Sequence, residues 1–388
     1  MDFIFLSHHF IHDDDDFVLK SGLLRWTSSF YRIVLAQGIS LYYMTIAPDT
    51  IAPLSHNIED YPDGIVLAVD KPYRWTSADV IRKVKWLACR HFGKKNLKVG
   101  HAGTLDPLAT GVLLVCIGNA TKRAEQLQAH DKEYIAGISF GATTPSYDLE
   151  KDIDRRFPTD KISESSVRET LKSFLGEQEQ VAPLFSAKSV DGVRAYELAR
   201  KLYRKQRSAS YEAEALHADP NNAENISDAS KQDASKQGAS KQDASKQDAS
   251  GSAEEQSQSV FDAHAAELIR TSRIRIDKLE LMNFSPDGTP AHAPSMSPDY
   301  SGMNEQEIAR AKEKDSRINI VDITPLHLPL AEIRISCTKG TYIRAFARDL
   351  GEALDSGAFL SYLIRSRNGD YPLSQALTMA QVSALFQD

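Results

Sequence analysis

One stretch of the sequence surrounds a lone carboxylate with turn-forming residues: Gly100-His101-Ala102-Gly103-Thr104-Leu105-Asp106-Pro107-Leu108-Ala109-Thr110-Gly111. The glycines and the proline predict a shaped loop between two apolar segments. A carboxylate such as Asp106 can act as a nucleophile or remove a proton, and neither role requires a metal or a cofactor. The alternative is that Asp106 caps a short helix beginning at Pro107. Spacing alone favours the cap, although a capped carboxylate would also stay ionised and fixed.

Hydrophobic periodicity predicts the elements that position this loop. Thr76 or Ser77 can cap a helix that buries Val80, Val84 and Leu87 on one face. Strands are expected near residues 64–69, 112–117, 134–140, 274–281 and 330–337, and helices near 167–175, 196–203 and 342–354. These elements follow one another without a regular βαβ rhythm, which favours an α+β fold over a doubly wound one.

The charge of the chain is unevenly distributed. The whole chain has a net charge of −7, but residues 61–204 carry 23 basic and 18 acidic side chains, a net charge of +5. The acidity lies mainly in residues 1–60 and 205–318. An acidic chain can therefore still present a basic surface to a polyanion, because local clustering of Lys and Arg decides this.

The cysteines and the apolar stretches bear on compartment. Cys89, Cys116 and Cys337 are far apart and lack metal-ligand spacing, so we expect reduced thiols, no metal site and a cytoplasmic protein. No stretch reaches the roughly 18 uninterrupted apolar residues of a membrane helix, and no export signal is evident. We expect no membrane association.

The domain organisation follows from composition. Residues 1–60 are expected to be an N-terminal extension, which would not be native before Met44 if translation starts there. Between residues 228 and 250 the unit Asp-Ala-Ser-Lys-Gln repeats without a large apolar residue, so 205–261 is expected to be a disordered insertion. A helix of alternating charge is the rival interpretation, which the recurring Ser and Asp argue against. Residues 285–318 are expected to form a second loop insertion, and 376–388 a C-terminal tail.

The loop around Asp106 resembles the catalytic-aspartate motif of the TruB branch of pseudouridine synthases, G-H-x-G-x-L-D-P-x-A-x-G-x-L. Other segments follow in family order. Lys71-Pro72 with Thr76-Ser77 resembles K-P-x-G-x-T-S, with Arg74 in place of the glycine. The remaining similarities are Lys132-Glu133-Tyr134 to K-x-Y, residues 180–200 to a longer Q-x-P-P segment, residues 337–344 to C-S-K-G-T-Y-I-R, and Leu363 with Arg365 to L-x-R. The resemblance implies a catalytic domain formed by 61–204 and 262–375.

The resemblance also implies roles for individual residues. Asp106 would be the catalytic carboxylate, and Arg344 would pair with it, a phosphate contact or a surface charge being the alternatives. Tyr134 would stack on the target base and take part in proton transfer, unless it is a core aromatic. Leu363 would pack against the flipped base, although a core leucine is the default. His101 would take the place of the extruded base, and a polar loop residue is the alternative.

Several lysines are expected to bind phosphates, a contribution that depends on salt and not on sequence. A solvated basic face remains the alternative for each of them. The residues are Lys71, Lys94, Lys95, Lys98 and Lys122.

Two segments depart from the family pattern. Residues 144–148, Thr-Pro-Ser-Tyr-Asp, keep only the ends of T-D-T-x-D, so the resemblance assigns Asp148 no role. Few residues follow Arg367, so we expect no C-terminal RNA-binding PUA domain.

Together these features predict an α+β pseudouridine synthase fold with a central mixed or antiparallel sheet and flanking helices. The function that the resemblance implies is isomerisation of the T-loop uridine at position 55 of tRNA after the base is flipped out. The expected partner is the tRNA T-arm, the expected state is a monomer, and no cofactor is expected. The alternatives are a non-catalytic tRNA-folding protein that uses the same surface, and an enzyme of the same fold that acts on ribosomal RNA.

Overall fold

A computed structural model of the 388-residue chain describes residues 12–13, 16–17, 53–183, 189–190, 193–194, 271–296, 304–316, 318 and 320–387. The chain divides into two units, Met1–Gln178 with Arg273–Asp388, and Glu179–Ser272. Every residue discussed as part of the candidate site lies in the first unit. The start at Met44, the helix near 196–203 and the insertion over 205–261 lie outside the described residues, as do parts of 61–204 and 262–375.

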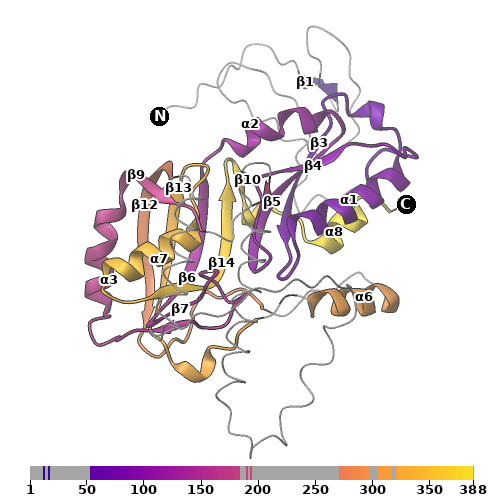
Figure 1. The fold of residues 1–388 in the computed structure, drawn as a ribbon. Coiled ribbons are helices and arrows are strands. Elements are labelled where there is room, and N and C mark those ends of the chain that lie inside the picture. Colours follow the sequence, from indigo (N-terminus) through magenta and orange to yellow (C-terminus); the bar gives the residue numbers. More distant parts are fainter. Residues whose placement is uncertain are drawn as a thin grey trace, which may run out of the picture. The chain divides into compact units, whose positions relative to one another are not determined.

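A mixed β-sheet forms the centre of the first unit (Figure 1). In the described part of the chain its order is β3-β5-β14-β6-β13-β12-β9, with β4 paired to β5 and β15 to β14. Strand β14 runs parallel to β5 and antiparallel to β6. The predicted α+β fold with a mixed sheet is therefore confirmed.

The strands are β1 (His12–Asp13), β2 (Asp16–Phe17), β3 (Ile65–Lys71), β4 (Val99–Ala102), β5 (Ala109–Ile117), β6 (Lys132–Phe140), β7 (Ala142–Thr143), β8 (Arg155–Arg156), β9 (Gly176–Val181), β10 (Ser189–Val190), β11 (Val193–Arg194), β12 (Thr271–Ser285), β13 (Leu330–Cys337), β14 (Ala358–Asn368) and β15 (Tyr371–Pro372). The α-helices are α1 (Ser77–His91), α2 (Ala124–Gln128), α3 (Glu164–Leu171), α6 (Glu305–Asp315), α7 (Ile343–Ala353) and α8 (Met379–Ala384). The strands expected near 64–69, 112–117, 134–140, 274–281 and 330–337 are all present, as are the helices that begin near Thr76 and Tyr342.

Helix α1 begins where the sequence predicted. Thr76 is its N-cap and forms a reciprocal capping box with Asp79, in which each side chain bonds to the other residue's backbone N–H. Val80, Val84 and Leu87 are buried on one face, at the spacing of successive helical turns. The cap fixes the start of α1 close to the Asp106 loop, because the Ser77 hydroxyl bonds to both the N–H and the C=O of Leu105.

Four helices share one apolar layer with the sheet. Val84 of α1, Val167 of α3, Phe346 of α7 and Val382 of α8 belong to the same buried cluster, which also includes Ile138 of β6. Figure 1 shows α3 and α7 beside the β6 and β12 side of the sheet, and α1 and α8 beside the β3 and β5 side. A second buried cluster joins β3, β5 and α2. Both ends of the sheet are therefore held by helices packed against them.

Two expectations from composition need correction. The expected loop over 285–318 contains the 11-residue helix α6. Asn304 and Glu307 each accept a hydrogen bond from the other's backbone N–H, and the sequence that follows is rich in helix-forming residues. The expected tail over 376–388 is part of the core: Leu377 bonds to the backbone of β3, and Met379, Val382 and Leu385 of this segment are buried. The average composition of these two segments did not indicate the helix in the first or the buried residues in the second.

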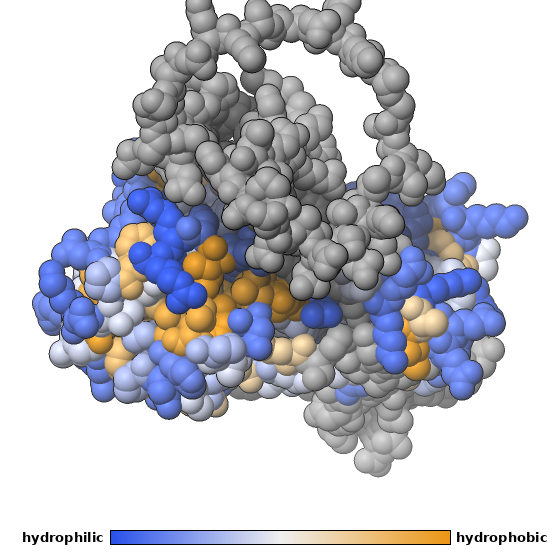
Figure 2. Space-filling model, turned by 60° about the horizontal axis from the view of Figure 1, so that its bottom comes forward, coloured by the Kyte–Doolittle hydropathy of each residue, from blue (hydrophilic) through white to orange (hydrophobic). Residues whose placement is uncertain are grey.

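Most large apolar side chains of the described part are buried. The exposed exceptions there are Trp86, Leu175, Val181 and Met296. On the face shown in Figure 2, hydrophilic residues border an area where hydrophobic residues gather. Among the described residues, no helix combines the length and the apolar character needed to cross a membrane.

Candidate active site

The loop that carries Asp106 connects β4 to β5. Its tight turn is closed by a hydrogen bond from the backbone N–H of Ala109 to the C=O of Asp106, at 3.1 Å. The chain then enters β5 directly, and no helix begins at Pro107. The helix-cap alternative for Asp106 is therefore wrong. The carboxylate is instead 40% exposed at the end of a buried strand.

Two glycines of the loop are required by its geometry. Gly103 and Gly111 have φ angles of +97° and +96°, a region that favours glycine. A Cβ atom on Gly111 would also lie 2.3 Å from the backbone oxygen of Arg365 on β14. Strands β5 and β14 therefore approach each other closely where the loop ends, and this places Asp106 next to β14.

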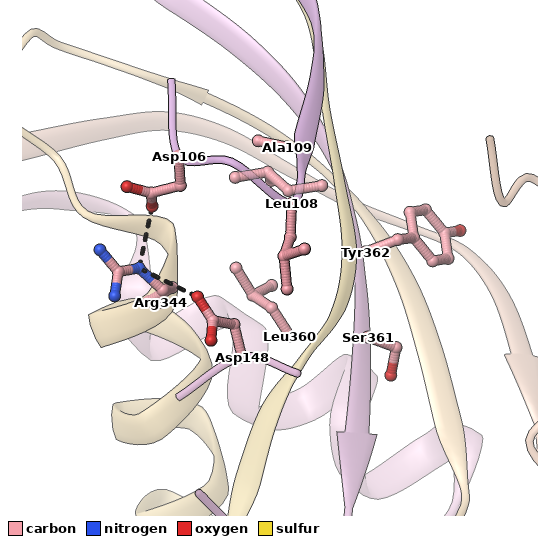
Figure 3. Close-up of a pocket in the computed structure, with 9 residues that line it drawn as sticks. Asp106, Leu108, Ala109, Asp148, Arg344, Leu360, Ser361 and Tyr362 are labelled. Carbon is pink, nitrogen blue, oxygen red and sulfur yellow. Dashed lines mark ion pairs between the residues drawn. The ribbon is translucent and has the colours of Figure 1, made fainter. Parts of the chain in front are cut away.

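Arg344, at the start of α7, holds the carboxylate. Its Nε lies 2.9 Å from Oδ2 of Asp106, and the arginine side chain is only 6% exposed (Figure 3). Its Nη1 donates to the C=O of Ser146 at 3.1 Å. Burial alone would lower the pKa of Arg344, but the carboxylates of Asp106 and Asp148 outweigh this effect and raise it. Arg344 is therefore a fixed cation that orients the Asp106 carboxylate.

Asp148 approaches the same guanidinium from the other side. Its Oδ2 lies 3.8 Å from Nε of Arg344, and its Oδ1 accepts hydrogen bonds from the Ser146 hydroxyl at 2.6 Å and from the backbone N–H of Glu150 at 2.9 Å. Burial raises the pKa of Asp148, and Arg344 opposes that shift. The two aspartates thus bracket one buried cation, the half-exposed Asp106 on one side and the buried Asp148 on the other.

An open pocket lies beside this trio. Figure 3 shows Asp106, Arg344 and Asp148 directed toward one another, with Tyr362 pointing away. The pocket is lined by Asp106, Leu108, Ala109, Asp148, Arg344, Leu360, Ser361, Tyr362 and Leu363. A carboxylate and a fixed cation beside an apolar wall are groups that can perform acid–base or nucleophilic chemistry.

Comparison with known proteins places the chain in a family. The family model of the TruB family pseudouridylate synthase (N terminal domain) matches residues 90–224. The chain is 36% identical over 320 residues to tRNA pseudouridine synthase B of Phocaeicola vulgatus, an alignment covering 82% of this chain and 92% of the relative. The chain belongs to the TruB family of pseudouridine synthases. It is accordingly an isomerase.

Other TruB-family relatives support the same assignment. The enzyme named tRNA pseudouridine synthase B of Bacteroides thetaiotaomicron is 38% identical, with 82% of this chain and 91% of the relative covered. The Thermus thermophilus protein of that name is 33% identical, with 81% and 76% covered. A solved H/ACA ribonucleoprotein bound to a substrate RNA containing 2′-deoxyuridine contains a chain that aligns at 17% identity and a TM-score of 0.40, covering 86% of this chain and 55% of that one. At that TM-score the solved structure adds nothing to the assignment.

Tyr134 and Leu363 lie on neighbouring strands of this TruB-family protein. Leu363 lines the pocket and is mostly buried. Tyr134 on β6 is 8% exposed, is the cross-strand partner of Arg365 and does not line the pocket. Burial raises the pKa of Tyr134, and the nearby Arg365 opposes that shift. The expected stacking of Tyr134 on the target base and the expected packing of Leu363 against it remain predictions.

Lys71 does not fit the phosphate-binding role that we expected. It is fully buried, and its ammonium group donates to the C=O groups of Pro72 at 2.9 Å, Trp75 at 2.6 Å and Pro107 at 3.3 Å. Burial lowers the pKa of Lys71 to about 7. Three carbonyls occupy the three donors of the amine, so Lys71 ties the end of β3 to the residue that follows Asp106.

The other expected RNA-binding residues lie on the surface or near it. Lys95, Lys98 and Lys122 are exposed, whereas Lys94 is ion-paired with Glu59 at 2.5 Å. His101 on β4 is partly buried. Burial lowers the pKa of His101, so its ring is neutral near pH 7. Their contacts with RNA remain predictions.

The departure from the family glycine at Arg74 has a structural consequence. Arg74 has a φ angle of +65°, in the left-handed region. The turn therefore has the left-handed backbone conformation that glycine adopts easily. Arg74 adopts it although residues with a side chain disfavour it.

Two residues of the site escaped the sequence analysis. Asp148 lies in a segment that matches only the ends of the family motif. Arg365 matched the family motif L-x-R, but the resemblance assigned it no role. The signal for Asp148 was the spacing Thr144-x-Ser146-x-Asp148, since the Thr144 and Ser146 hydroxyls bond to Asp148 and hold its turn. Within the described residues, no group of three or more His, Cys, Asp or Glu side chains is placed to hold a metal ion.

Proposed function

We propose that this TruB-family isomerase converts the uridine at position 55 in the T-loop of tRNA into pseudouridine, with Asp106 as the catalytic carboxylate. The observation that carries the proposal is the 2.9 Å ion pair between Asp106 and the buried Arg344 beside an open pocket. The choice of tRNA is supported by the relatives named tRNA pseudouridine synthase B that the chain resembles over most of its length.

The reaction requires the C1′–N1 bond to break, the base to turn, and C5 to bond to C1′. C5 then loses its proton and N1 gains one, so the product is an isomer and no redox partner is needed. A carboxylate can drive this as a nucleophile or as a proton acceptor, and both roles require the ionised form. Arg344 places its guanidinium 2.9 Å from this carboxylate, where it orients the group and balances its charge.

Further residues act on the base and the RNA in this proposal. Leu363 packs against the flipped uracil, and Tyr134 stacks on it and assists proton transfer. His101 fills the gap that the base leaves in the T-loop, since a stacked base must be extruded before chemistry. Lys95 and Lys122, both exposed, contact phosphates.

A mutation at Asp106 tests the mechanism. D106N keeps the size of the side chain and removes its charge, so we expect pseudouridine formation to fall by at least about 1,000-fold while tRNA affinity stays within about threefold. D160N, at an exposed acid, serves as the control and should match wild type. Retained isomerisation by D106N would refute the mechanism.

The substrate is tested separately. We expect a T-arm minihelix to be modified at its position-55 uridine, and ribosomal RNA fragments of equal length to remain unmodified. Pseudouridine is detected by carbodiimide-stop sequencing. If only the ribosomal fragments were modified, ribosomal RNA and not tRNA would be the substrate. The proposed chemistry at Asp106 would still hold.

A further inference from the structure

Arg365 on β14 is a buried cation that the proposed mechanism does not use. Its side chain is 1% exposed, and in the described part of the chain no carboxylate lies within ion-pairing distance of it. Arg344 lies against the carboxylates of Asp106 and Asp148, whereas Arg365, within the described residues, donates to backbone carbonyls. Burial of an unpaired charge is costly, so the hydrogen bonds that compensate Arg365 identify what it holds.

Those hydrogen bonds go to both sides of the Asp106 loop. Nη2 donates to the C=O of Gly103 at 3.1 Å and Nη1 to that of Thr104 at 3.4 Å, just before Asp106. Nε donates to the C=O of Val112 at 2.6 Å, after it. One planar guanidinium therefore connects the start of the loop to its end, a geometry that a single ammonium group cannot reproduce.

The backbone of Arg365 confines the same loop. Arg365 pairs with Gly111 on the parallel strand β5, where a Cβ atom would overlap the Arg365 backbone. On its other side, Arg365 is the antiparallel cross-strand partner of Tyr134, and its charge opposes the rise in the Tyr134 pKa that burial causes. Arg365 thus contacts the loop that carries Asp106 and is the cross-strand neighbour of Tyr134.

We propose that Arg365 is a positioning residue, whose guanidinium holds both ends of the Asp106 loop against β14, beside Tyr134, for the isomerisation. This inference rests on the proposed function. It differs from a general packing role in one measurable respect. Loss of the planar guanidinium should slow the chemical step without weakening RNA binding, because this side chain is buried and bonds to backbone carbonyls of the protein.

The variant R365K tests the proposal, because it keeps the positive charge and the aliphatic stem but loses the planar guanidinium, which bonds to three carbonyls at once. The matched control is R367K on the same strand, where the arginine is 41% exposed and bonds to the C=O of Gly369. Single-turnover pseudouridine formation and tRNA affinity are measured for both variants and wild type, with thermal unfolding as a check of folding. We expect R365K to lose at least about 30-fold in rate with affinity within about threefold, and R367K to match wild type in rate.

Two results would overturn the positioning role. One is a rate for R365K within about threefold of that for R367K. The other is a parallel fall of rate and tRNA affinity, which would indicate a general loss of structure. If wild type and R367K fail to modify tRNA, the proposed function fails instead, and the two failures are thereby distinguished.

Discussion

Replacement of Asp148 by asparagine should slow the isomerisation without unfolding the protein. The variant D148N keeps an oxygen that can accept from the Ser146 hydroxyl and from the N–H of Glu150, so the turn should survive. It removes the charge that lies 3.8 Å from Nε of Arg344. Arg344 then keeps its ion pair with Asp106 but loses the attraction of the second carboxylate, so it is less firmly held.

The magnitude follows from the geometry. Two unit charges 3.8 Å apart interact by about 4 kcal/mol at an effective dielectric constant of roughly 20. This is an upper limit for the loss, because Arg344 retains Asp106 and the C=O of Ser146. If half of the interaction orients Arg344 in the transition state, the loss is about 2 kcal/mol, which corresponds to a rate decrease of ~30-fold.

The D148N substitution should lower the rate of isomerisation but should not lower the stability of the folded protein. Burial raises the pKa of Asp148, so the folded protein binds this proton more tightly than the unfolded chain does. Ionised Asp148 therefore costs stability above its ordinary pKa, and the cost disappears as the pH falls and the folded protein takes up the proton. We expect D148N to be at least as stable as wild type at pH 7, with the difference shrinking toward pH 4.

The assay is single-turnover pseudouridine formation on a T-arm minihelix, with urea unfolding at several pH values. D154N is the matched control, because Asp154 is an exposed acid on the same connection, bonded to the Thr143 hydroxyl and not to Arg344. A D148N rate within threefold of that of D154N would refute the view that Asp148 orients Arg344. A rate loss accompanied by an equal loss of folded protein would refute it as well.

Three further outcomes are expected. K71M should destabilise the protein by about 3 kcal/mol or more, because three carbonyls lose their donor. Because burial lowers the pKa of Lys71 to about 7, we expect the stability of wild type to rise between pH 7 and 10 and K71M to lack this rise; urea unfolding as a function of pH checks both. R74G should leave stability unchanged or raise it by up to about 1 kcal/mol, because glycine relieves the positive φ but costs entropy, and a larger loss would contradict this. K95A and K122A should each reduce the salt dependence of tRNA binding by about one ion, whereas K94A, at a lysine ion-paired with Glu59, should reduce it less.

The sequence by itself determined the local features of this protein. The glycines and the proline around Asp106 predicted a shaped loop, and the capping residues and apolar spacing predicted where α1 begins. These features depend on neighbours a few residues apart, which is the range over which periodicity and turn chemistry act. The partnership of Arg344 with Asp106 was inferred from resemblance, because no spacing rule links residues so distant in the chain.

Only the tertiary structure decided which charged residues are buried and which partners they have. Lys71 was expected on the surface, yet it lies under the site with its amine bonded to three carbonyls. In the sequence, Asp148 belonged to a partly matching motif and Arg365 to a matching one, and neither had a role. The structure places Asp148 beside Arg344 and bonds Arg365 to the loop that carries Asp106. Whether a charge is exposed to solvent or buried depends on which elements pack over it. That packing is set by contacts between strands and helices far apart in the chain, so it cannot be predicted from local residue patterns.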